Sequence, residues 1–89
     1  MKHFSIRITG KVQGVFFRAS AKEKADELKI TGTARNNADG SVSIEAEGKE
    51  ENLMHFVEWC KEGPPLSLVE HCEIKENALQ YFRNFSIKH

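Results

Sequence analysis

The 89-residue chain has few of the residues that mark specialised classes of protein. It has two cysteines and two prolines, and its thirteen basic residues are balanced by thirteen acidic ones. One pair of cysteines cannot make the disulfide framework of a small secreted scaffold, so we expect Cys60 and Cys72 to be reduced thiols. A chain without net charge has no overall attraction for nucleic acid or an anionic membrane, and we expect neither as a partner.

Long apolar runs are also missing. No stretch approaches the roughly 18 consecutive apolar residues that a membrane-spanning helix needs. The first residues, Met1 to Arg7, alternate polar and apolar side chains, whereas a secretory signal needs a continuous apolar segment. We therefore expect a cytoplasmic protein. No metal-ligand spacing links the four histidines, so we expect a surface or packing role for each of His3, His55, His71 and His89.

The spacing of apolar residues predicts the secondary structure. Alternating or extended patterns predict strands over residues 3–9, 30–36, 41–47, 66–75 and 82–88. Helical spacing predicts helices over residues 17–29 and about 50–61, and Gly63-Pro64-Pro65 ends the second. The Asp39-Gly40 pair is typical of a hairpin turn over residues 37–40. Residues 10–16 contain two glycines and are predicted to be irregular.

This order of elements, β-α-β-β-α-β with a short strand appended, predicts the fold class. Each helix has one apolar stripe and must cover one face of a sheet. We expect one domain over residues 1–89, an α+β sandwich of two layers. It is of the ferredoxin-like kind, with a mostly antiparallel sheet and both helices on one face. The other face is expected to be solvated and to carry Glu45 and Glu47, which are not expected to form a catalytic pair. Such a fold serves many functions and selects none.

The segment between the first strand and the first helix has the parts of a phosphate-binding loop. It reads Gly10-Lys11-Val12-Gln13-Gly14-Val15-Phe16-Phe17-Arg18. Glycines let successive backbone N–H groups point into one concavity, and the helix start adds unpaired N–H groups. The Arg18 guanidinium matches a phosphate in shape and charge. No Gly-Lys-Ser/Thr ending is present, so an ATP site is not implied. Composition alone also permits a plain connection beside a surface arginine.

The same nine residues resemble the acylphosphatase signature, G-x-V-Q-G-V-x-F-R, at every defined position. A second stretch, residues 32–42, is similar to that family's G-W-V-R-N-x-x-D-G-x-V pattern. It departs from the pattern only at Thr33 and Ala34, where an aromatic residue and valine are usual. Trp59, Gly63-Pro64-Pro65, Val69 and the ending from Phe85 to Lys88 also resemble the family, so the likeness spans nearly the whole chain.

The resemblance implies a hydrolase of acyl phosphates. Arg18 matches the phosphate-binding arginine and Asn36 the asparagine that orients the attacking water. The phosphate-binding backbone amides match Gln13, Gly14, Val15, Phe16 and Phe17. No metal and no organic cofactor is implied, and we expect a monomer. The side chains of Phe16 and Phe17 are expected to pack in the core. Strand alternation places Asn36 on the helix-covered side, at the strand end, where it could reach the loop.

Two other functions remain open on the residues. A ferredoxin-like sheet can display aromatic side chains to RNA bases, but the third strand offers Ser43, Glu45 and Glu47, which would repel phosphate. An acylphosphatase-like domain could also bind an anion without turnover. The Thr33-Ala34 departure favours that reading, because weaker packing could misplace Asn36. The presence of both Arg18 and Asn36 favours catalysis.

Overall fold

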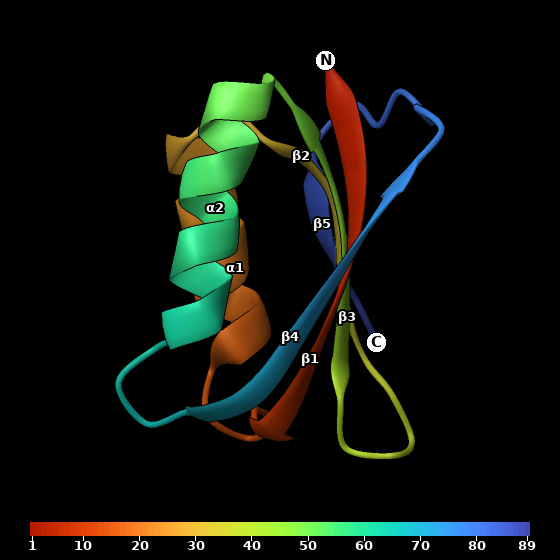
Figure 1. Cartoon of the computed structure of the whole chain (residues 1–89). Helices are drawn as coiled ribbons and strands as arrows, with labels where there is room; N and C mark the ends of the chain where they lie inside the picture. Colours follow the sequence, from red (N-terminus) through yellow and green to blue (C-terminus); the bar gives the residue numbers. More distant parts are fainter.

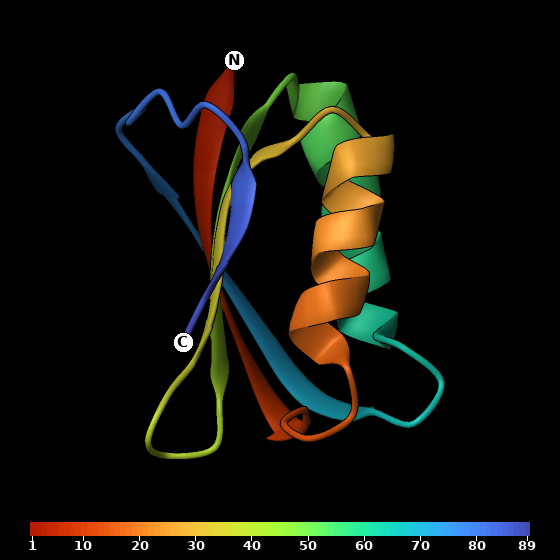
Figure 2. The same cartoon turned by 180° about the vertical axis from the view of Figure 1, so that it is seen from behind.

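The structure, a computed structural model, describes all residues from 1 to 89 and contains five strands and two helices. In chain order they are β1 (Lys2–Lys11), α1 (Phe17–Glu27), β2 (Thr31–Asn36), β3 (Val42–Gly48), α2 (Glu50–Glu62), β4 (Leu68–Asn77) and β5 (Phe85–Lys88). The strands form one sheet in the order β4-β1-β3-β2-β5, and both helices cover the same face (Figure 1, Figure 2). Only the β2–β5 pair is parallel. The ferredoxin-like α+β prediction is therefore confirmed.

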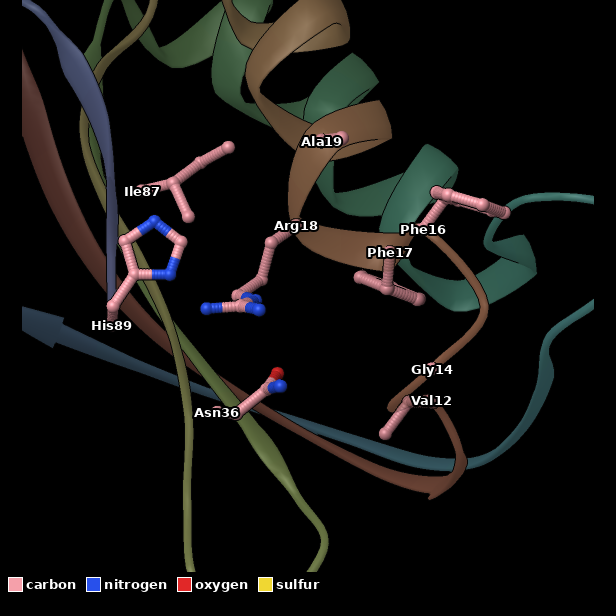
Figure 3. Close-up of a pocket in the computed structure, with 9 residues that line it drawn as sticks. All are labelled: Val12, Gly14, Phe16, Phe17, Arg18, Ala19, Asn36, Ile87 and His89. Atoms are coloured by element: carbon pink, nitrogen blue, oxygen red, sulfur yellow. The ribbon is translucent and has the colours of Figure 1, made fainter.

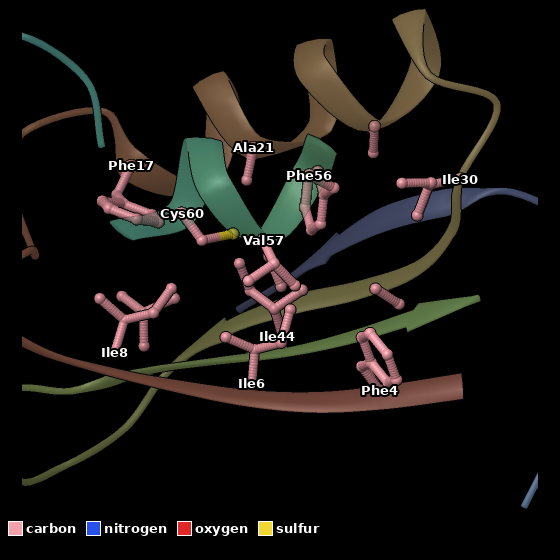
Figure 4. Packing of buried hydrophobic residues seen from close by; sticks show 14 of the residues in the cluster. Phe4, Ile6, Ile8, Phe17, Ala21, Ile30, Ile44, Phe56, Val57 and Cys60 are labelled. Carbon is pink, nitrogen blue, oxygen red and sulfur yellow. The ribbon is translucent and has the colours of Figure 1, made fainter. Parts of the chain in front are cut away.

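The core lies between the sheet and the two helices. Ile6, Ile8 and Ile44 project from the sheet toward Phe56 and Val57 of α2, and all five side chains are buried (Figure 4). Burying a side chain of this size contributes roughly 1.5–3 kcal/mol. The apolar stripes of the helices therefore hold both of them on one face of the sheet.

Phe17, the first residue of α1, anchors the start of that helix in the core. Its ring is 2 % exposed and packs against Trp59 of α2, with ring centroids 5.4 Å apart. Trp59 stacks in turn on Phe56. The position of the loop before α1 is thus determined by aromatic packing, as expected for Phe17.

β1 extends further than the sequence predicts. Gly10 and Lys11, assigned above to an irregular segment, continue the strand beside β4, with a shift of register between Thr9 and Gly10. Gly10 has a φ of 126°, and a Cβ there would lie 2.1 Å from the carbonyl oxygen of Leu68. Glycine permits this close approach of two backbones, and the bulge turns the end of β1 toward the loop.

α1 ends at Glu27, two residues before the predicted end at Lys29. Lys29 has a φ of 58°, in the left-handed region. Its N–H donates to the carbonyl of Asp26, and the N–H of Ile30 donates to Ala25. This is the Schellman pattern of helix termination, with lysine where glycine is usual, and it caps two carbonyl groups that the helix leaves unpaired.

The last two strands are shifted from their predicted bounds. β4 begins at Leu68 and not at residue 66, because residues 64–67 form a turn in which the Ser67 N–H and hydroxyl both donate to the Pro64 carbonyl. β5 begins at Phe85 and not at residue 82, because the backbone before it bonds to a side chain of β3.

That side chain belongs to Glu47, and the prediction that Glu47 lies on a solvated face is wrong. Glu47 is 1 % exposed, because the segment before β5 covers it. Its carboxylate accepts hydrogen bonds from the backbone N–H groups of Gln80 and Phe82 and from Nδ1 of His3, which is also buried. Burial alone would raise the pKa of Glu47, but these hydrogen bonds outweigh it and hold that pKa below its ordinary value. Glu47 therefore fixes the segment that leads into β5.

Neither helix has the length and apolar character that crossing a lipid bilayer requires.

We predict that Glu47→Gln lowers the free energy of unfolding by about 2 kcal/mol at pH 7, because the amide NH₂ faces a backbone donor. A carboxylate whose folded pKa is lowered stabilises the fold above its unfolded pKa, near 4.5. The advantage of the wild-type chain should therefore shrink as the pH falls below about 4.5 and through the folded pKa. Urea unfolding between pH 3 and 7 measures both effects.

Glu58→Gln is the matched control for that experiment, since Glu58 lies on the exposed side of α2 and pairs only with Lys61, at 3.4 Å. Its free energy of unfolding should change by less than about 0.5 kcal/mol. Equal losses in the two variants would contradict the role assigned to Glu47.

Candidate active site

A pocket of about 310 Å³ opens where the loop before α1 faces the ends of β2 and β5 (Figure 3). One wall is formed by the loop and the first turn of α1, with Val12, Gly14, Phe16, Phe17, Arg18 and Ala19. The other wall belongs to the sheet, with Asn36, Ile87 and His89. The two resemblance motifs, which are separate in sequence, therefore meet at one site.

The loop presents a row of backbone donors. Gly14 and Phe16 have φ values of 73° and 64°, in the left-handed region, while the intervening Val15 keeps an ordinary φ. Alternation of this kind turns successive N–H groups toward one side and forms an anion-binding concavity. The N–H groups from Gln13 to Phe16 donate no hydrogen bond within the chain. These donors are thus unpaired and available to a ligand.

The start of α1 adds to this donor surface. The first N–H groups of a helix have no partner within it and carry the positive end of the helix dipole. No side chain caps α1, and its first turn has no acidic residue. The helix terminus therefore favours an anion at the same place as the loop.

Arg18 is the only arginine or lysine on the pocket wall, and His89 is the only histidine there. Arg18 is half-buried, and its guanidinium is directed into the space between Asn36 and His89 (Figure 3). One nitrogen donates to the carbonyl oxygen of Lys88 at 2.7 Å. This bond orients the guanidinium and leaves other donors of the five free for an anion.

Asn36 is the last residue of β2 and lies on the opposite wall from Arg18. Its neighbour two residues earlier, Ala34, is fully buried beneath the helices, so alternation places Asn36 on that side too. The Thr33-Ala34 departure does not move Asn36 out of the pocket. The Asn36 side chain has no hydrogen-bond partner within the chain, although it is half-buried.

The hairpin turn beyond Asn36 is held by Asp39. Its carboxylate accepts hydrogen bonds from the hydroxyl and the backbone N–H of Ser41 and contacts Arg7. These interactions lower the pKa of Asp39 to about 2, the Ser41 hydroxyl acting most strongly. Asp39 is thus a turn residue, as its sequence context predicts.

The other predicted loop residues differ in the direction of their side chains. Gln13 does not line the pocket: its amide donates to the carbonyl oxygens of Asn37 and Ser41, at 2.8 and 3.0 Å, and joins the loop to the β2–β3 hairpin. Val15 is buried in the core. The prediction that Phe16 packs in the core is wrong, because its side chain is 74 % exposed. Phe16 precedes the helix in a left-handed conformation, which takes its side chain off the apolar stripe of α1.

Sequence reasoning missed Ile87 and His89 as pocket residues. His89 is expected above to have only a surface or packing role. β5 pairs with β2 so that Lys88 lies opposite Arg35. The next residue along each strand, His89 and Asn36, is therefore carried to the same wall. The resemblance covers the ending from Phe85 to Lys88 but gives it no place at the site, because that place depends on a pairing between two distant segments.

No three His, Cys, Asp or Glu side chains gather in a way that could hold a metal ion. Both cysteines are unpaired, and neither lines the pocket. Burial raises the pKa of the Cys60 thiol and, less strongly, that of Cys72. Thiols of this kind are poor nucleophiles at neutral pH.

The fold and the pocket together define a small α+β protein with an anion-binding loop facing an unpaired amide. A match to a known protein family narrows this class further. The sequence model of the acylphosphatase family matches residues 4–87, and the chain belongs to that family, whose members are hydrolases that act on acid anhydrides.

Individual relatives agree with this assignment. The chain is 52 % identical over 80 residues to an acylphosphatase of Legionella pneumophila, covering 90 % of this chain and 88 % of that one. It is similar to the crystal structure of acylphosphatase from Bacillus subtilis, with a TM-score of 0.97, 40 % identity and full coverage of both chains. It also resembles part of full-length HypF, with a TM-score of 0.93 and 30 % identity, covering 99 % of this chain and 12 % of HypF.

We predict that Gln13→Ala lowers the free energy of unfolding by about 1–2 kcal/mol, since it removes two hydrogen bonds between the loop and the hairpin. Gln13→Glu should cost at least as much, because its carboxylate would face two carbonyl oxygens. Urea unfolding measures the loss. Gln80→Ala is the control: it removes an exposed amide that makes no side-chain hydrogen bond. A loss as large in this control would contradict the prediction.

Proposed function

We propose that this chain hydrolyses acyl phosphates to a carboxylate and inorganic phosphate. One observation carries the proposal: Arg18, Asn36 and the unpaired N–H groups of the loop face one pocket. Membership of the acylphosphatase family supports it. We further propose that residues 1–89 act as a single cytoplasmic, monomeric domain that uses no metal.

The phosphoryl group binds between Arg18 and the loop. Its oxygens accept hydrogen bonds from the guanidinium and from the backbone N–H groups of Gln13, Gly14, Val15, Phe16 and Phe17. Negative charge on these oxygens is redistributed as the transition state forms, and donors already in place stabilise it without reorganising. The bond from Arg18 to Lys88 supports this role, because it holds the guanidinium ready before substrate arrives.

Asn36 orients the attacking water. Its side-chain carbonyl accepts a hydrogen bond from the water, while its NH₂ group is free to donate to the substrate. A positioned water turns an encounter in solution into a step within the complex, which lowers its entropic cost. The lack of any partner for Asn36 within the chain supports this role, since the amide has no competing bond.

The water oxygen attacks phosphorus in line with the acyl oxygen. The bond between phosphorus and the acyl oxygen breaks, and its electron pair leaves with the carboxylate. One proton of the water stays on the new phosphate oxygen, and the other passes to a second oxygen of the phosphoryl group. A carboxylate is a good leaving group, so the step needs no general acid. This accounts for a pocket wall without a carboxylate or a thiol.

We predict that Asn36→Ala lowers kcat for an aromatic acyl phosphate by about a hundredfold or more, while inhibition by phosphate stays nearly unchanged. Arg18→Gln should instead weaken both phosphate inhibition and turnover, because it removes the cation that binds the anion. Spectrophotometric hydrolysis with phosphate as a competitive inhibitor measures both. Full turnover by Asn36→Ala would show that the water is positioned by another group.

Asn37→Ala is the control for this pair. The Asn37 amide donates to the hydroxyls of Ser41 and Ser43 and does not line the pocket. Its loss should lower stability but leave kcat within about twofold. Phosphate binding by the wild-type chain with no turnover of any acyl phosphate would favour a non-catalytic anion-binding domain.

We predict that treatment with a metal chelator leaves kcat and KM unchanged, because every proposed step uses protein donors and the oxygens of the substrate. The same assay, run before and after dialysis against the chelator, measures this. Loss of activity that is restored by adding a divalent cation would contradict the metal-free mechanism.

A further inference from the structure

His89 is the one ionisable side chain on the pocket wall that has no place in the mechanism above. Its imidazole lies on the sheet side, next to Ile87, and faces the space that the Arg18 guanidinium enters (Figure 3). Histidine is the side chain whose ordinary titration falls in the physiological pH range. A ligand in the pocket therefore meets an imidazole as well as the Arg18 guanidinium.

The backbone before His89 is tied to α1. Lys22 of α1 donates to the carbonyl oxygen of Phe85 at 3.1 Å, and Arg18 donates to that of Lys88 at 2.7 Å. β5 is thus tied to α1 at both of its ends and paired with β2 along its length. His89 follows directly on the second tie, so its backbone starts at the edge of the anion site.

The side-chain charges nearest His89 on the helix side of the sheet come from α1. α1 contributes Arg18, and one turn further on Lys22, which is paired with Asp26 at 2.9 Å. Arg35 of β2 and Lys88 of β5 are in register and alternate with the pocket residues Asn36 and His89, so their side chains lie on the other face of the sheet. No Asp or Glu side chain lines the pocket. A proton on His89 therefore adds positive charge to a positive site, and a bound dianion stabilises that proton.

We propose that His89 is a further substrate-contacting residue, whose imidazolium form gives the phosphoryl site a second cation and strengthens anion binding as the pH falls through neutrality. The proposal rests on the function proposed above, since it assumes that the phosphoryl group lies at Arg18. Proton binding to His89 and anion binding to the pocket then favour one another to the same extent.

Sulfate is a suitable probe, because it stays a dianion from pH 5.5 to 8.5 whereas phosphate changes charge. We expect the sulfate Kd of the wild-type chain, measured by NMR titration, to be about fivefold lower at pH 5.5 than at pH 8.5. His89→Gln should bind sulfate weakly across the whole range. His89→Lys, with a lasting positive charge, should bind it tightly at both ends. His71→Gln on β4, at the opposite edge of the sheet, should behave like the wild-type chain.

The imidazole signals give an independent readout. Saturating sulfate should shift the imidazole NMR signals of His89 and leave those of His55 and His71 in place. A wild-type affinity that does not change with pH, or a pH dependence that persists in His89→Gln, overturns the role of His89 alone. Sulfate binding that is absent, or unaffected by Arg18→Gln, overturns this proposal and the proposed phosphate site together.

Discussion

The hydrogen bond from Arg18 to the carbonyl of Lys88 joins the first helix to the last strand, and the site exists only where these two meet. Arg18 contributes the charge, while β5 contributes the wall that faces it. β5 in turn reaches this place because Glu47 binds the backbone before it. A buried carboxylate on the far side of the sheet from the helices thus supports a pocket on the helix side.

The anion site combines backbone N–H donors with the side chains of Arg18 and His89. The loop N–H groups are part of the backbone and keep their direction through the left-handed residues Gly14 and Phe16. Arg18 and His89 are side chains, and only the first carries its charge at every pH. Affinity for an anion can therefore have a constant part, from the backbone and Arg18, and a part that depends on protons.

Local spacing predicted the elements, whereas Arg18 and Asn36 were singled out by the resemblance to the family motifs. Alternation places Ala34 and Asn36 on one side of a strand wherever that strand lies. Glu47 shows where the same rule fails: the face opposite the helices is solvated only until another segment covers it, and alternation carries no information on that segment. His89 was missed because its place follows from the pairing of β5 with β2. The end of α1 was misplaced because Lys29 takes a backbone conformation that its residue type does not signal.

The pocket draws its walls from the beginning, the middle and the end of the chain, and this has a consequence for folding. Bringing such distant segments together costs chain entropy before any contact between them forms. The parallel pairing of β2 with β5 is therefore expected to form late. During refolding, the helices are therefore expected to form before the pocket forms. Recovery of turnover during refolding then measures docking of the final strand, whose Phe85 also completes the core against Phe56.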